Sequence, residues 1–118
     1  MKIIQTLQTV VEACEDRKAE NSVVLNMDNL TPVADYFVIC HGNNERQVQA
    51  IARSVKESLE EKGQHVNRIE GFEQARGILI DVGDIICHIF HRDERAYYNL
   101  ERLWGDAVAV SVGEQNNQ

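Results

Sequence analysis

The feature that most constrains the fold is a pair of apolar runs separated by four residues rich in turn formers. Residues 78–80 and 85–90 are rich in isoleucine and other residues typical of buried strands. Between them, residues 81–84 read Asp-Val-Gly-Asp, which suits a tight turn with Gly83 where a type II turn requires a positive φ. We therefore expect a β-hairpin.

The register of this hairpin decides which side chains share a face. With residues 82–83 as the turn, Ile80 pairs with Ile85 and Leu79 with Ile86. One face is then wholly apolar and has to be covered by helices. The other face is mixed, as expected for a surface that is wet in the free protein and buried in a complex. The mixed face carries Gly77, Leu79, Asp81, Asp84, Ile86, His88 and Phe90. A first or third helix lying over it is the alternative.

Helical spacing of apolar residues marks three segments. Residues 2–18 carry apolar side chains at three- and four-residue intervals. A second helix follows Asn44, which together with Gln47 has the character of a capping box, and Gly63 ends it. A third helix is expected over residues 92–104.

Three further short segments complete the expected sheet. Residues 23–25 and 35–40 are apolar runs that indicate buried strands, and Pro32 between them favours an irregular connection. Residues 65–69 alternate weakly, as an edge strand does, and residues 71–76 indicate a loop. The order of elements predicts an α+β fold, a mixed β-sheet flanked by helices.

Length and composition fit one globular domain. Of the 118 residues, 43% are hydrophobic and 26% are charged, values typical of a folded chain. We expect a single domain over residues 1–106 and a C-terminal tail over residues 107–118. The formal net charge of −7 disfavours a bare nucleic-acid surface and favours a protein partner, so no sequence-specific nucleic-acid binding is expected.

The N-terminus and the cysteines indicate the cellular compartment of the protein. The chain begins with a charged amphipathic segment in place of the apolar stretch of a secretion signal, and we expect no membrane span. Cys14, Cys40 and Cys87 are an odd number with no Cys-x-x-Cys pair, which argues against a disulfide framework. A cytoplasmic protein is therefore expected.

No motif indicates catalysis. A two-metal transferase needs converging carboxylates behind a Gly-Ser turn, whereas Gly42 is followed by Asn43 and no Asp-x-Asp occurs. Asp81 and Asp84 lie at the expected hairpin turn, where aspartate is favoured because it caps backbone groups. We expect no enzymatic activity and no cofactor.

Two cysteine–histidine pairs are candidate zinc ligands. Cys40-His41 and Cys87-His88 are each adjacent residues on an expected strand, so the two side chains point to opposite faces and cannot easily chelate one ion. Buried cysteines that act as small hydrophobes are the simpler interpretation, and no metal site is expected. For His88, direct contact with a partner and an internal hydrogen bond both stay open.

Three strings of the sequence carry a resemblance to a known family. Residues 34–52, from Ala-Asp-Tyr-Phe-Val-Ile-Cys onward, residues 81–90, and residues 98–106, which read Tyr-Asn-Leu-Glu-Arg-Leu-Trp-Gly-Asp, are similar to the ribosomal silencing factor or Iojap family. The match runs in one order from near the N-terminus to Asp106.

This resemblance implies a nucleotidyltransferase-like topology, although a shared fold does not transfer that chemistry. It also implies a factor that binds the large ribosomal subunit through ribosomal protein fourteen and sterically blocks joining of the small subunit. Such a factor represses translation when nutrients are limiting. A small nucleotidyltransferase-like enzyme, a large-subunit assembly factor and a homodimeric interaction module are the alternatives.

One departure from the family lies on the mixed face. Members commonly carry tryptophan just before the 78–80 strand, where this chain has Gly77, so a contact aromatic is missing or Gly77 only marks the strand entry. Phe72, Phe90 or Trp104 could supply the anchor instead. The expected partner-binding residues are Gly77, Leu79, Ile86, His88, Phe90, Tyr98, Leu100 and Trp104. For Tyr98 and Trp104, closing the core is the alternative role.

Overall fold

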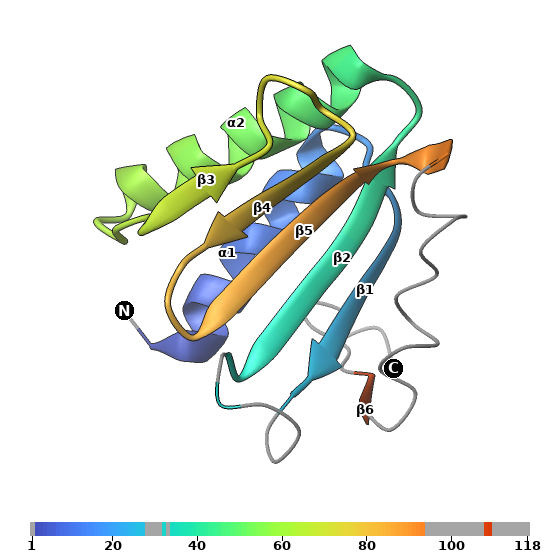
Figure 1. The fold of residues 1–118 in the computed structure, drawn as a ribbon. Coiled ribbons are helices and arrows are strands. Elements are labelled where there is room, and N and C mark those ends of the chain that lie inside the picture. Colours follow the sequence, from blue (N-terminus) through green and yellow to red (C-terminus); the bar gives the residue numbers. More distant parts are fainter. Residues whose placement is uncertain (1, 28–31, 33, 94–107, 110–118) are drawn as a thin grey trace.

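The computed structural model describes residues 2–27, 32, 34–93 and 108–109. Within these residues the chain forms two helices and six strands (Figure 1). In chain order they are α1 (Ile3–Asp16), β1 (Glu20–Asn26), β2 (Tyr36–Gly42), α2 (Glu45–Glu61), β3 (Arg68–Glu70), β4 (Gly77–Asp81), β5 (Ile85–His91) and β6 (Val108–Ala109).

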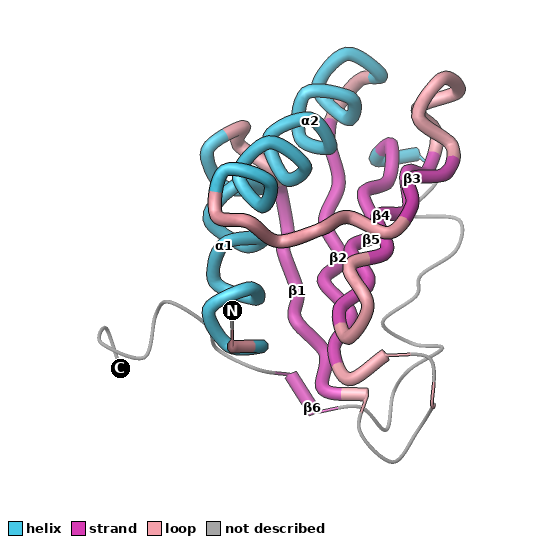
Figure 2. The backbone as a smooth tube through the Cα atoms, turned by 90° about the vertical axis from the view of Figure 1, so that its left-hand side faces the viewer, coloured by secondary structure: helices cyan, strands magenta, loops and turns pink. Residues whose placement is uncertain are grey.

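The strands form one mixed sheet in the order β3-β4-β5-β2-β1-β6. β2 and β5 pair in parallel, and the other neighbours are antiparallel. Both described helices pack on the same face of this sheet (Figure 2). The predicted α+β class with a mixed sheet is confirmed. The nucleotidyltransferase-like topology stays a prediction. Of the helix expected over residues 92–104, only residues 92–93 are described, and both are helical; residues 94–104 lie outside the described residues.

Local sequence patterns predicted both described helices correctly. The Asn44 side chain accepts a hydrogen bond from the backbone N–H of Gln47 at 2.8 Å, the N-cap contact that the sequence predicts. The Gln47 side chain accepts from the N–H of Asn43, one residue before the position of a standard capping box. After α2, Gly63 adopts φ +79, as expected where a helix ends.

The main core lies between the two helices and the sheet. Leu7 and Val10 of α1 and Ile51 and Leu59 of α2 are fully buried against the apolar sheet face. The three cysteines are free and buried in this layer, as their interpretation as small hydrophobes predicts. From β4 and β5, Ile78, Ile80, Ile85, Cys87 and Ile89 supply the sheet side of the core.

The hairpin of β4 and β5 is confirmed, but its predicted register is wrong by two residues. Leu79 pairs with His88, not with Ile86, because the two central turn residues are Gly83 and Asp84 rather than Val82 and Gly83. Gly83 has φ +97 at the first central position, where a type II′ turn favours glycine and matches the strand twist. A shift of two residues preserves the alternation of faces, so the predicted face assignment holds for the residues of β4 and β5. The placement of Asp84 on the mixed face is wrong, because Asp84 is a central turn residue and belongs to neither strand.

β6 had no signal in the sequence. Val108 and Ala109 pair antiparallel with Asn26 and Leu25 of β1, although they lie in the segment expected to be a tail. A two-residue strand shows no periodicity of its own, and its formation depends on the β1 edge that it meets.

Candidate docking surface on the sheet

The mixed face of the sheet is the candidate functional site, and we call it the second face. α1 and α2 both lie on the opposite face, so the alternative in which the first helix covers the second face is wrong (Figure 1). The other possible cover was the helix expected over residues 92–104, of which residues 94–104 lie outside the described residues. The second face carries Val23, Leu25, Phe37, Ile39, His41, Gly77, Leu79, Asp81, Ile86, His88 and Phe90.

The predicted partner-binding residues on this face differ in accessibility. Phe90 and Ile86 are only 4% and 6% exposed, and Phe90 belongs to a second apolar cluster with Leu25, Met27 and Ile39. Gly77, Leu79 and His88 are half-buried, so part of each residue stays accessible. Tyr98, Leu100 and Trp104 lie outside the described residues.

His88 is held in place by its neighbour two residues on. The imidazole stacks on the Phe90 ring with a centroid distance of 4.1 Å and an interplanar angle of 29°. Burial lowers the pKa of His88 from 6.5 to about 4, because the surroundings disfavour the charged form. His88 is therefore a neutral imidazole at physiological pH, with both a donor and an acceptor nitrogen.

Gly77 lies directly opposite Phe90 in the hairpin. A Cβ atom at position 77 would lie 3.4 Å from two atoms of the Phe90 ring, which is ordinary van der Waals contact, and 3.8 Å from Nε2 of His88. The Phe90 ring thus lies over the space beside Gly77. A side chain at position 77 would border the stack of His88 and Phe90.

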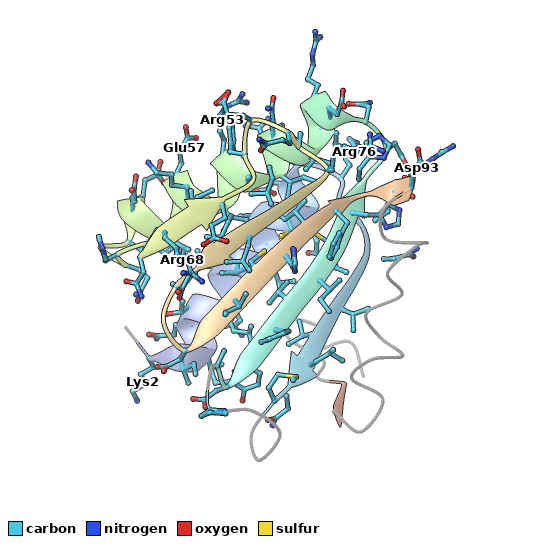
Figure 3. The ribbon with its side chains drawn as sticks, viewed as in Figure 1. Lys2, Arg53, Glu57, Arg68, Arg76 and Asp93 are labelled. Atoms are coloured by element: carbon cyan, nitrogen blue, oxygen red, sulfur yellow. The ribbon has the colours of Figure 1, made fainter. Side chains whose placement is uncertain are left out.

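The outer edge of the second face is charged. Nε of Arg68 lies 3.2 Å from Glu70 and 3.7 Å from Asp81, and Figure 3 shows Arg68 beside β3 and β4. These exposed ion pairs contribute little to stability. Asp81 also accepts a hydrogen bond from the N–H of Gly83 at 2.9 Å. The predicted turn-forming role of Asp81 is therefore confirmed.

Phe72 is excluded as the anchor of this face. It packs against the main core, and the Arg53 guanidinium lies 5.4 Å from its ring centroid. The Gln49 side chain donates to the Phe72 carbonyl at 2.9 Å. Both partners belong to α2, so Phe72 fastens the 71–76 loop to the helix layer.

The described residues contain no group of three or more His, Cys, Asp or Glu side chains that could hold a metal ion. Cys40 lies in the main core, while His41 follows it on the second face and lies 3.5 Å from Glu20. Among the described residues, no helix is long and apolar enough to cross a membrane.

The geometry defines a class of protein: a small α+β domain whose sheet has one helix-covered face and one mixed face with half-buried apolar and histidine side chains. The family model described as "Ribosomal silencing factor during starvation" matches residues 1–118. The chain belongs to this family, and the predicted resemblance is confirmed.

Two relatives are similar over nearly their whole length. Ribosomal silencing factor RsfS of Halalkalibacterium halodurans is 56% identical over 108 residues, which cover 92% of each chain. The factor of the same name from Bacillus subtilis is 50% identical over 112 residues, covering 95% of each. A crystal structure of a Chromobacterium violaceum protein superposes with a TM-score of 0.87 at 33% identity, covering 96% of this chain and 93% of that one.

Proposed function

We propose that this protein is a translation repressor that binds the large ribosomal subunit through ribosomal protein fourteen and sterically blocks joining of the small subunit. It acts without catalysis, in the cytoplasm, when nutrients are limiting. Membership of the ribosomal silencing factor family supports the ribosome as the target.

The proposed location of the docking surface rests on one observation. Leu79 and His88 are half-buried neighbours on the sheet face opposite to both described helices. An apolar and a neutral polar side chain placed side by side are typical of the centre of an interface between proteins. The formal charge of −7 favours a basic protein partner over exposed phosphate.

The residues proposed to form or border the docking surface are those predicted from the sequence. Leu79 and His88 make the direct contact beside Gly77, Phe90 stacks on His88, and Ile86 lies on the same face. Tyr98, Leu100 and Trp104 are proposed to border the surface.

Subunit joining tests the proposal directly. Purified protein is added in excess to separated small and large subunits at a Mg²⁺ concentration that permits joining, and the 70S fraction is measured in a sucrose gradient. We expect the 70S fraction to fall and the protein to migrate with the large subunit. Joining that is equally complete at saturating protein would contradict the proposal.

The identity of the partner is tested separately. Isolated ribosomal protein fourteen is immobilised, and binding is measured for the full chain and for the Glu57→Lys variant, in which an exposed side chain of α2 is changed on the opposite side of the sheet (Figure 3). We expect equal binding by both proteins. Failure of the wild-type protein to bind would exclude this ribosomal protein as the contact.

A further inference from the structure

Phe90 is the most buried aromatic residue described on the second face. The two residues that its ring borders, Gly77 and His88, are only half-buried. Its ring stacks on His88 within β5 and borders the empty side-chain position of Gly77 on β4. The ring is also part of the second apolar cluster, which includes Ile39 of β2. One side chain therefore connects three strands at the proposed docking surface.

The packing leaves the imidazole of His88 little freedom. A ring stacked at 4.1 Å restricts rotation about the side-chain bonds, and Leu79 lies directly opposite His88 on the neighbouring strand. An oriented donor or acceptor binds more tightly than a mobile one, because less side-chain entropy is lost on binding.

We propose that Phe90 is a positioning residue, which lies across Gly77 and fixes the His88 imidazole as the oriented polar contact for a protein partner. This inference rests on the proposed function, because it assigns His88 a role in the same docking surface. The proposed role of Phe90 also gives a reason for glycine at position 77. A larger side chain there would compete with the Phe90 ring for the space across the hairpin.

The first test needs no ribosome. The titration of His88 is followed by NMR in the isolated wild-type protein and in Phe90→Leu, which removes the ring but keeps an apolar side chain. Phe37→Leu is the matched control, because Phe37 also packs against the second cluster but lies on β2. We expect the His88 midpoint to rise toward 6.5 in Phe90→Leu and to stay near 4 in the control.

The second test measures binding to ribosomal protein fourteen by the same variants. We expect Phe90→Leu to bind roughly tenfold more weakly, the effect of one disordered hydrogen bond at an interface, and Phe37→Leu to bind within about twofold of wild type. Gly77→Ala should keep the wild-type His88 midpoint, because a Cβ fits beside the ring.

The outcomes separate this inference from the proposed function. If a folded Phe90→Leu variant keeps the wild-type His88 midpoint, the positioning role is overturned even where ribosome binding is intact. If the midpoint shifts but binding is unchanged, His88 is not the oriented contact and the inference fails. Should Phe90→Leu not fold, Phe90→Met provides the same comparison with a larger and more adaptable side chain. Failure of wild-type protein to bind overturns the proposed function, while the NMR titration still tests the stack.

Discussion

Gln47 and Lys18 join the start of α2 to the end of α1. The Gln47 side-chain Nε2 donates to the carbonyl of Lys18 at 3.0 Å and to that of Arg17 at 3.1 Å. Lys18 adopts φ +61 just beyond α1, and its carbonyl accepts a hydrogen bond from a side chain of α2. One amide thus satisfies helix-end carbonyls of α1, while its oxygen accepts from the backbone N–H of Asn43.

We expect Gln47→Ala to lower the free energy of unfolding by about 1–2 kcal/mol, because three hydrogen bonds are lost at partly exposed positions. Gln47→Glu should cost more, since a carboxylate would face two carbonyl oxygens. Denaturation in urea measures both changes. Glu57→Ala, on the exposed side of the same helix, is the control and should stay within about 0.5 kcal/mol of wild type. An equal stability of Gln47→Ala and the control would show that the amide does not join the helices.

Two glycines with similar backbone angles should differ in their tolerance of alanine. Gly71 has φ +81, and a Cβ there would lie 2.3 Å from the Gly77 carbonyl oxygen. Gly63 has φ +79 with no atom within 4 Å of the same position. We expect Gly63→Ala to cost about 1 kcal/mol, the conformational penalty alone, and Gly71→Ala to cost about 3 kcal/mol or more. Thermal unfolding compares them, and equal melting temperatures would contradict the close approach.

Stability should fall in acid partly because of His88. Its folded-state pKa of about 4 lies below the ordinary value of 6.5, so between these values the unfolded chain binds a proton that the folded chain does not. The contribution of His88 to the free energy of unfolding is therefore fully present above pH 6.5. It is lost as the pH falls towards 4, by about 3 kcal/mol at most. Urea denaturation at a series of pH values measures the loss. In His88→Asn the slope between pH 6.5 and 4 should be shallower, and an unchanged slope would contradict the assignment.

Leu79→Glu tests the docking surface. Because Leu79 is half-buried on the second face, the carboxylate can reach water, so the melting temperature should stay within a few degrees of wild type. Binding to the large subunit should be lost, since an unpaired charge would be buried in the complex. Ile80→Glu is the contrast, because the fully buried Ile80 faces the main core and its variant should not fold. A folded Leu79→Glu protein that binds as well as wild type would show that the docking surface lies elsewhere.

Local patterns predicted most of the described fold because each depends on residues close in sequence. The helical spacing before Lys18, the cap at Asn44 and the apolar runs of the hairpin all correspond to observed elements. The faces of β4 and β5 also followed, because alternation along a strand survives a register error of two residues.

The register itself required the tertiary structure. Gly83 with positive φ fits either a type II or a type II′ turn, and only the pairing of the strands decides between them. β6 is a similar case, because its two residues become a strand only through the edge of β1. Neither choice is visible in the residues of the turn or the strand alone.

The candidate site, like the fold, was predicted only in part from the sequence. By itself the sequence determined the family, the face on which each residue of β4 and β5 lies, and the surplus of negative charge. Only the tertiary structure decided that both described helices lie on one face, that Phe72 belongs to the helix layer, and that the Phe90 ring lies beside Gly77 against His88. The physical reason is that burial and ring stacking depend on neighbours distant in sequence, whereas alternation and charge are properties of the chain itself.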